Sequence, residues 1–381
     1  TNIFYNMSHD VIVGLQFGDE GKGKVIYSLL TDGDGDGNNN NTNKKYTHCV
    51  RFNGGPNAGH TIYHNGNKLV THQIPTGIFY GLTCIIGSGC VIDIDKLEAE
   101  IKMVEQSGVD NVRHLLKIAY NCHVITKEFV EEDATTDKIG STKSGIRPTY
   151  REKYNRAGTR AETLGTSICG CQIINPYNEL SQDSVCVLFE GAQGFMLDID
   201  YGYYPYVTSS HCHTAMISTT GVSFRNIDRV YGIAKLYNTY VGTRKFQPED
   251  DEDLKKLAQM GEEFGSTTGR LRQCYWLNLD ELTQAIEVNG VSDLIINKCD
   301  IMEQLGVFKL VHRDSLNDDN DIDNIKIGDM SEKSENNKSN CIKSFNTLQE
   351  MKDYITDYLN SIFKKNKLRI TFSSNKYSIN F

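Results

Sequence analysis

The feature that most constrains this chain is a glycine-rich turn between a short apolar run and a helix-like segment. The run Val11–Leu15 has the length of a buried strand, and Val25–Leu30 continues as a helix. Between them stands Gly18-Asp-Glu-Gly-Lys-Gly-Lys24. Successive glycines let backbone N–H groups approach phosphate oxygens, and a helix N-terminus favours negative charge. This order of elements predicts an α/β fold with a phosphate site.

The turn departs from an ordinary P-loop at its end. The spacing from Gly18 to Lys24 satisfies the pattern, but Val25 occupies the position of the Ser or Thr that binds magnesium. Asp19 and Glu20 are also unusual there, because carboxylates repel phosphate unless a metal or a proton transfer involves them. A turn that merely packs a helix on a strand is the alternative interpretation.

The rest of the chain alternates strands with helices. This alternation predicts a large, mainly parallel central sheet with helices on both faces, in which ligands bind at the carboxyl ends of strands. Further strands are predicted at His48–Phe52, Cys84–Gly87, Val185–Phe189, Arg229–Tyr237, Leu294–Asn297 and Leu368–Phe372. Helices are predicted at Asp95–Gln106, Leu254–Met260, Leu277–Val288 and Tyr354–Phe363.

Composition limits the domain plan and the partners. Residues 1–10 are expected to be an N-terminal extension and 11–381 one catalytic domain, with polar loop insertions near 32–45 and 315–340. A formal charge of −9 argues against a nucleic-acid surface. No apolar run approaches the roughly eighteen residues of a membrane span, and no signal pattern opens the chain. Eleven cysteines without a disulfide-framework spacing favour a reducing compartment, the cytoplasm.

A second motif, Asn297-Lys-Cys-Asp300, follows the predicted strand Leu294–Asn297. A carboxylate at this place can accept hydrogen bonds from the guanine N1–H and 2-amino groups, and adenine offers no such donor pair. Four residues can also match by chance in a surface loop. Together with a phosphate loop in an α/β chain, the motif favours GTP.

A third motif, Asn53-Gly-Gly-Pro-Asn-Ala-Gly-His60-Thr61, follows the second predicted strand. Its small residues allow a ligand to approach the backbone closely. His60 ends the loop, and a histidine beside a phosphate site is a candidate acid or base. A lone histidine is more often structural, so both interpretations remain open at this point.

Five motifs resemble the adenylosuccinate synthetase family, in the family's order, between about Val11 and Asp300. They are Gln16-Phe-Gly-Asp-Glu-Gly-Lys-Gly-Lys24, Asn57-Ala-Gly-His-Thr61, Phe189-Glu-Gly-Ala-Gln-Gly194, Tyr204-Pro-Tyr-Val-Thr-Ser-Ser210 and Gly265-Ser-Thr-Thr-Gly-Arg270. The resemblance implies a P-loop-like GTP-binding ligase fold. It also implies ligation of L-aspartate to the 6-position of IMP, giving adenylosuccinate, GDP and phosphate through a 6-phosphoryl purine, with Mg²⁺.

The resemblance also implies catalytic roles. Asp19 would take the purine N1 proton, and it would bind magnesium together with the Gly59 carbonyl. His60 would be the acid at the moving phosphoryl group, Lys22 would neutralise phosphoryl oxygens, and Gln193 would contact the purine. These roles make chemical sense, because a purine 6-oxygen leaves readily only once phosphorylated, and that step needs a base, an acid and a cation.

The same resemblance implies three sets of binding residues. For GTP they are Gly18, Glu20, Gly21, Gly23, Lys24, Thr61, Arg272, Lys298, Cys299, Asp300, Ser373, Ser374 and Asn375. For IMP they are Asn57, Ala58, Ser141, Thr142, Arg156, Gln193, Thr208 and Arg270. For aspartate they are Ser266, Thr267, Thr268, Gly269, Arg270 and Arg272. Arg156 would reach into the partner subunit, which implies a homodimer. A solvated charged turn is the alternative for the arginines near 270.

Several positions depart from the family pattern. Pro56 replaces a common histidine, Gly140-Ser-Thr-Lys-Ser-Gly145 replaces the usual phosphate turn, and 158–185 is short, which leaves the usual dimer contacts open. These changes raise a second hypothesis, a related ligase that acts on dGMP and leads to 2-aminoadenine nucleotides. That branch typically lacks the aspartate that Asp19 preserves, so IMP is the favoured acceptor.

Two rival classes remain. A regulatory GTPase would use the phosphate loop and the Asn-Lys-x-Asp motif, but its Asp-x-x-Gly would have to be Asp32-Gly-Asp-Gly35, within low-complexity sequence. A zinc protein is suggested by His211-Cys-His213 and Cys169-Gly-Cys171. Neither pair has a spaced partner pair, so both are expected to be structural.

Overall fold

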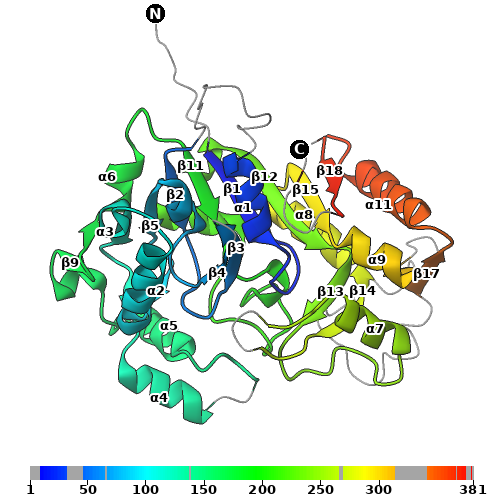
Figure 1. The fold of residues 1–381 in the computed structure, drawn as a ribbon, viewed down its shortest axis with the longest axis horizontal. Helices are drawn as coiled ribbons and strands as arrows, with labels where there is room; N and C mark the ends of the chain where they lie inside the picture. The colour runs from blue at the N-terminus through cyan, green and yellow to red at the C-terminus, as the bar shows by residue number, and fades with distance from the viewer. Residues whose placement is uncertain are drawn as a thin grey trace, which may run out of the picture.

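A ten-stranded sheet forms the centre of the protein, in the order β18-β15-β12-β1-β11-β2-β5-β7-β10-β9 (Figure 1). All neighbouring strands are parallel except β9, which is antiparallel to β10. The bounds are β1 (His9–Gly14), β2 (His48–Arg51), β5 (Thr83–Ile86), β7 (Leu116–Ala119), β9 (Ser167–Ile168), β10 (Cys171–Ile174), β11 (Val187–Glu190), β12 (Ile227–Lys235), β15 (Asp293–Asn297) and β18 (Arg369–Phe372). The predicted mainly parallel sheet is confirmed.

This computed structural model describes residues 9–31, 46–64, 67–136, 139–265, 269–313, 341–365, 367–374 and 379. The polar stretch 32–45, with Asp32–Gly35, and the stretch 315–340 lie outside these ranges. So do Ser266, Thr267, Thr268 and Asn375 among the expected binding residues. Strand β1 begins at His9, so the last two residues of the expected N-terminal extension belong to the sheet.

The central strands carry apolar residues at consecutive positions, as in Val11–Val13 and Val187–Phe189, because both faces of the sheet are covered. Val11 and Val13 belong to one hydrophobic cluster, whereas Ile12 between them belongs to another. Strand β11 shows the same alternation, with Phe189 on the first side and Leu188 on the second. Side chains of a strand alternate between faces, so the two clusters are the two layers that sandwich the sheet.

Helices supply both layers, as predicted. On the side of Ile12 lie apolar residues of α1 (Lys22–Thr31) and α2 (Ile94–Gln106). On the other side lie those of α8 (Leu279–Asn289), α9 (Cys299–Leu305) and α11 (Leu348–Ile362). The other α-helices of the described ranges are α3 (Val112–Leu115), α4 (Lys127–Thr136), α5 (Ile146–Asn155), α6 (Pro176–Leu180) and α7 (Glu252–Met260). No helix within the described ranges has the length and apolarity needed to cross a bilayer.

Three smaller sheets complete the part of the chain that the structure describes. One has four strands in the order β13-β14-β16-β17, and the others are the pairs β3-β4 and β6-β8. Their bounds are β3 (His60–His64), β4 (Asn67–Thr71), β6 (Val91–Ile92), β8 (His123–Val124), β13 (Tyr237–Tyr240), β14 (Gln273–Asn278), β16 (Phe308–Val311) and β17 (Ile342–Phe345).

The predicted helices begin at other residues than expected, and for two of them the capping residue explains the difference. The helix expected from Leu277 begins at Leu279, because the Asn278 side chain accepts from two backbone N–H groups of the first turn. The residues before it form β14. The helix expected from Tyr354 begins at Leu348, where Thr347 caps the first turn by accepting from Glu350 N.

The parallel sheet gathers the sequence motifs at one edge. The strands β1, β2, β11, β12, β15 and β18 all end at this edge, at Gly14, Arg51, Glu190, Lys235, Asn297 and Phe372. The phosphate loop, the 53–60 loop, the 191–194 turn and the Asn-Lys-x-Asp segment each follow one of these ends. Ligands of open α/β sheets bind at such an edge.

Candidate active site

The glycine-rich turn between β1 and α1 has the backbone of an anion-binding loop. Gly18 and Gly21 adopt φ of 88° and 95°, and Asp19 between them also has a positive φ of 59°. Gly23 lies in the first turn of α1 (Lys22–Thr31), and a Cβ there would lie 2.4 Å from the Thr61 carbonyl oxygen. Helix α1 therefore packs directly on the backbone of β3, the strand that begins with His60.

Glu20 stabilises this loop from within. The side chain is buried, and Oε1 accepts from the backbone N–H groups of Gln16 (3.2 Å) and Gly18 (2.7 Å). Its other oxygen pairs with Lys22 Nζ at 3.0 Å. Lys22 also donates to the Gln193 carbonyl at 2.5 Å. The Glu20 carboxylate, which is unusual in a phosphate-binding loop, thus points into the protein. Any contact of Glu20 with a nucleotide would therefore use its backbone.

Asp19 is held by a network of buried charges. Its carboxylate accepts a hydrogen bond from Arg272 Nη2, and Arg272 Nη1 donates to Glu263 at 2.5 Å. Glu263 also accepts from Lys235 (3.1 Å) and Tyr237 (2.6 Å). Burial disfavours the charge of Glu263, but the surrounding cations outweigh it and lower its pKa to about 2. The Asp19 side chain keeps 27% of its surface exposed, so a ligand can reach it.

His60 lies in a second buried charge cluster. Its Nδ1 is hydrogen-bonded to Glu190 Oε1, and Arg51 Nη2 donates to the same oxygen at 3.0 Å. Glu190 further accepts from the backbone N–H (2.7 Å) and hydroxyl (3.0 Å) of Thr76. A carboxylate on one ring nitrogen fixes the orientation and tautomer of the imidazole and leaves Nε2 for a substrate.

The charge state of His60 depends on what occupies the site. Burial, followed by the positive charge of Arg51, lowers the pKa of His60 to about 4, and Glu190 opposes this shift. The imidazole is therefore neutral at pH 7 in the free protein. A phosphoryl group beside Nε2 would add negative charge and raise the pKa, which is what an acid at that position needs.

Sequence analysis gave Glu190 no role, although the residue stands in one of the quoted motifs. The structure places it directly opposite Arg51 in the register of β2 and β11. The signal was available: each of the two charged residues ends an apolar strand of a parallel sheet. Charged residues in that position face the ligand edge and need a partner there.

The loops after β2 and β11 meet at Gln193. This residue has a positive φ of 55°, and its amide donates to Asn57 Oδ1 at 3.1 Å. Gly54 permits the approach, since a Cβ there would lie 3.0 Å from Gln193 Oε1. The structure therefore brings the expected purine contacts Asn57 and Gln193 together, beside Lys22.

The expected guanine residues converge at the end of β15 and β18. Lys24 Nζ donates to the Ser373 hydroxyl at 3.1 Å, and Cys299 N donates to the Ser373 carbonyl at 3.2 Å. Asp300 lies in the first turn of α9, after Lys298 with its positive φ of 67°. Burial lowers the pKa of Lys24 to about 8, with Asp300 opposing the shift. Ser374 follows as an exposed residue.

The expected 5′-phosphate residues are grouped only in part. A Cβ on Gly140 would lie 3.3 Å from Arg270 Nη1, so the Arg270 side chain reaches the turn that carries Ser141 and Thr142. Thr208 is tied to the 193–198 segment through its N–H, which donates to the Leu197 carbonyl at 2.8 Å. Arg156 is an exposed residue at the C-terminal end of α5.

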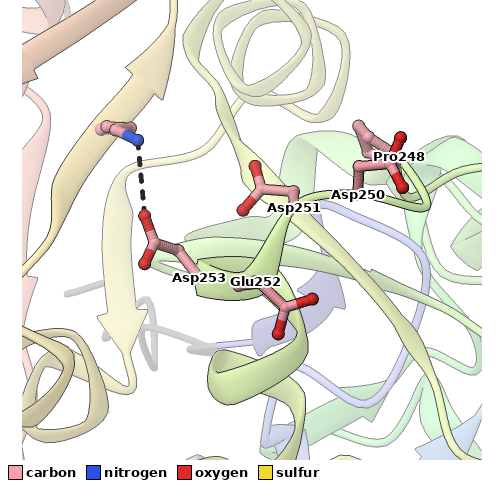
Figure 2. A pocket seen from close by; sticks show the side chains of 6 residues that line it. Pro248, Asp250, Asp251, Glu252 and Asp253 are labelled. Atoms are coloured by element: carbon pink, nitrogen blue, oxygen red, sulfur yellow. Dashed lines mark ion pairs between the residues drawn. The ribbon is translucent and has the colours of Figure 1, made fainter.

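Figure 2 shows a surface depression at the start of α7, lined by Pro248, Asp250, Asp251, Glu252, Asp253 and Lys309. Its acidic residues have local explanations. Asp251 caps α7 by accepting from Leu254 N at 3.1 Å, and Asp253 pairs with Lys309 at 3.6 Å. Carboxylates in the first turn of a helix are stabilised by its dipole. The depression is thus a capped helix start.

The sheet edge and its residues define a nucleotide-dependent α/β enzyme, with a carboxylate, an imidazole and a lysine beside an anion-binding loop. The chain belongs to the adenylosuccinate synthetase family, whose model matches residues 11–169 and 171–377. It is therefore a carbon–nitrogen ligase. This membership excludes the regulatory-GTPase interpretation.

Relatives and solved structures agree with this assignment. The adenylosuccinate synthetase of Chlorobium phaeobacteroides is 38% identical, with 78% of this chain and 77% of that protein covered. That of Thermodesulfovibrio yellowstonii is 38% identical, with 80% of each covered. The structure of fully ligated adenylosuccinate synthetase from Plasmodium falciparum matches with a TM-score of 0.74, at 24% identity, and covers 98% of this chain and 100% of that one. This last similarity concerns the fold.

Glu190→Gln should lower kcat by more than about tenfold and change KM values little, because general acids contribute about 10²–10⁴-fold to rates. Glutamine keeps the shape of the side chain but cannot favour protonated His60. The alkaline limb of the pH–rate profile should also move to lower pH, because His60 must be protonated to act as an acid and Glu190 raises its pKa.

A matched control is Asp293→Asn, which alters another buried carboxylate paired with an arginine, Arg369. Both residues begin their strands, so they lie at the end of the sheet opposite to the proposed site. The Asp293→Asn variant should keep kcat. A Glu190→Gln enzyme with normal kcat and an unshifted profile would show that Glu190 serves only the fold.

GTP affinity of the free enzyme should weaken as pH rises through about 8, where Lys24 loses its proton. The loss should reach about tenfold per pH unit above that pKa if one proton is required. Lys24→Arg should remove the dependence, since arginine stays protonated. Calorimetric titrations with GTP at several pH values measure this, and an identical pH dependence in both proteins would rule Lys24 out.

Proposed function

We propose that this protein uses GTP to join L-aspartate to the 6-position of IMP, giving adenylosuccinate, GDP and phosphate. The chain's membership in the adenylosuccinate synthetase family supports the reaction. The observation that carries the proposal is the position of Asp19, an accessible carboxylate inside a loop shaped for phosphate. Such a group is explained when it takes up a proton from a bound base while a phosphoryl group arrives.

In this proposal each catalytic residue has one task in the transfer of the proton and the phosphoryl group. Asp19 accepts the N1 proton of the purine, so that the 6-oxygen becomes nucleophilic towards the γ-phosphoryl group. His60, oriented by Glu190, donates a hydrogen bond or proton to the moving phosphoryl group. Lys22 breaks its ion pair with Glu20 and neutralises phosphoryl oxygens instead. Gln193 binds the purine. The amino group of aspartate then forms a bond to C6 and loses a proton, while the C6–O bond breaks and inorganic phosphate leaves with the former 6-oxygen.

Magnesium is the proposed cofactor, held by the Asp19 carboxylate and the Gly59 carbonyl. Oxygen donors of this kind suit Mg²⁺, and they fit a site next to phosphate oxygens. When bound, the ion supplies positive charge that offsets the charge of the phosphoryl group. Arg272 now holds Asp19, so this arginine has to release the carboxylate, consistent with its proposed contacts to GTP and aspartate.

The remaining proposals concern binding and assembly. Lys298, Cys299, Asp300 and Ser373 hold the guanine, and Ser141, Thr142, Thr208 and Arg270 hold IMP. We further propose a homodimer in which the exposed Arg156 serves the partner's site, one catalytic domain over 11–381, and a cytoplasmic location.

A dGMP-dependent ligase is the second candidate. The cyanophage S-2L succinoaminodeoxyadenylate synthetase, solved with dGMP and with dATP as energy donor, matches with a TM-score of 0.63 at 23% identity, covering 77% of this chain and 85% of that one. This similarity concerns the fold. The retained Asp19 favours IMP.

A matrix of initial rates should decide between these acceptors. IMP and dGMP are each combined with GTP or ATP, with aspartate and Mg²⁺ constant, and the succinylated product is measured by absorbance. We expect turnover with IMP and GTP, at least about tenfold faster than any other combination, since each buried hydrogen-bond partner left unpaired costs about 1–3 kcal/mol. Product from dGMP alone would replace IMP, and GTP hydrolysis without an acceptor would contradict the ligase.

Asp19→Asn should lower kcat by at least about 10²-fold while GTP binds nearly as before, because the amide cannot accept the N1 proton. Asparagine tolerates the positive φ of this position, so the loop should keep its shape. Asp183→Asn, which changes an exposed carboxylate on another loop, should be active. Near-normal turnover of Asp19→Asn would show that another group is the base.

A further inference from the structure

We propose that Asp198, His211 and His213 form a binding site for a divalent transition metal of the zinc class. This site is separate from the magnesium position at Asp19 and Gly59. One ligand atom from each of the three residues lies within 4.8 Å of the others. Two imidazoles and one carboxylate are a donor set that Zn²⁺ accepts, with a fourth position open to water.

The local backbone explains why only the two histidines of the His211-Cys-His213 sequence take part. His213 is extended, with φ −103° and ψ 163°, so that alternate side chains point to opposite sides. Cys212 faces the other way, with Sγ 3.8 Å from the Ser210 carbonyl and 4.0 Å from Gln193 Oε1. Within the described residues, the cluster of ligand atoms comprises Asp198, His211 and His213 and does not include this thiol.

Asp198 is a fixed anchor for the site. Its side chain is fully buried. Oδ1 accepts from the N–H groups of Asp200 (2.9 Å) and Tyr201 (3.3 Å), and Oδ2 accepts from Cys212 N at 2.5 Å. A carboxylate offers about four lone-pair positions, so Oδ2 retains one for a metal. These N–H groups hold the carboxylate in place before any ion arrives.

The two imidazoles are positioned for the same ion. His211 Nδ1 lies 3.4 Å from Asp198 Oδ1, the ring centroids of His211 and His213 are 5.0 Å apart, and Tyr201 packs edge-on against His213. Imidazole binds a metal in its neutral form, so each ring can supply one nitrogen to the ion. Asp200, whose Oδ2 lies 3.9 Å from His211 Nε2, is exposed and can complete the coordination.

This arrangement changes the interpretation of the His-x-His sequence. It was expected to be structural because no spaced partner pair accompanies it, but the fold supplies a partner thirteen residues upstream of His211. An ion at this site would join the two ends of the 198–213 segment. That segment carries Thr208, and its Cys212 Sγ lies 4.0 Å from Gln193 Oε1. Because Thr208 and Gln193 are proposed to bind IMP, the metal would stabilise one wall of the proposed IMP pocket.

Metal binding can be measured without turnover. The full-length protein is stripped with a chelator and titrated with Zn²⁺ in excess Mg²⁺ and without nucleotide. We expect one tightly bound Zn²⁺ per chain. His211→Ala and His213→Ala should each weaken it at least as much as the loss of an outer-shell partner does, about 10- to 100-fold. His114→Ala, at an exposed position of α3, is the matched control and should bind normally.

Two further measurements secure the result. His213→Gln preserves the size of the side chain and should fold, as circular dichroism would show, yet bind zinc as weakly as His213→Ala. Co²⁺ in place of Zn²⁺ should give ligand-field bands without a sulfur-to-metal band. The proposal fails if the wild type binds no stoichiometric Zn²⁺, if the histidine variants bind it equally well, or if a sulfur-to-metal band assigns the ion to cysteines.

Discussion

The proposed active site, at the carboxyl ends of the parallel strands, depends on charges that are buried in pairs. Glu20 with Lys22, Glu190 with Arg51 and Glu263 with Lys235 are all almost inaccessible to water. An uncompensated buried charge costs several kcal/mol, so the removal of one partner destabilises the other. The two residues proposed for proton transfer, Asp19 and His60, are attached to these pairs. These pairs hold both side chains in place before a substrate binds.

This arrangement is incomplete within the described residues. Nε and Nη1 of Arg51 and Nε of Arg272 are buried and have no hydrogen-bond partner there. Buried polar groups are nearly always satisfied in native proteins, and exceptions gather where ligands bind. Unpaired guanidinium nitrogens in both charge clusters are therefore consistent with a site that becomes electrostatically complete only with anionic substrates.

Much of the fold was predictable because a doubly covered parallel sheet leaves a simple signal. Its strands are short apolar runs, and the motifs follow them directly, so the sequence also predicted that these motifs meet at the carboxyl ends of the strands. The long-range ion pairs were not predictable in the same way. Asp19 and Arg272 are 253 residues apart, and Glu190 and Arg51 are 139 apart, so a local pattern can mark each residue but cannot show which residue it pairs with. The same holds for the joining of Asp198 to two histidines.

The predicted boundaries of some helices were wrong for a more local reason. The residues Leu277 and Asn278 fit a helical period, yet Asn278 accepts two N–H groups and ends a strand instead. Periodicity reports which face is buried, whereas the capping side chain decides where the helix begins. A closer inspection of cap residues would have corrected both helix starts.

The inward-facing Glu20 has a consequence for how quickly and how tightly nucleotide can bind. Glu20 Oε1 accepts hydrogen bonds from the N–H groups of Gln16 and Gly18, so the loop is already ordered without a ligand. Ordering costs on association are about 0.5–1.5 kcal/mol for each immobilised side chain, so a rigid receptor retains more of its contact energy as affinity. Nucleotide capture by this protein should then approach a simple docking event, with the slower rearrangements left to Arg272 and Lys22.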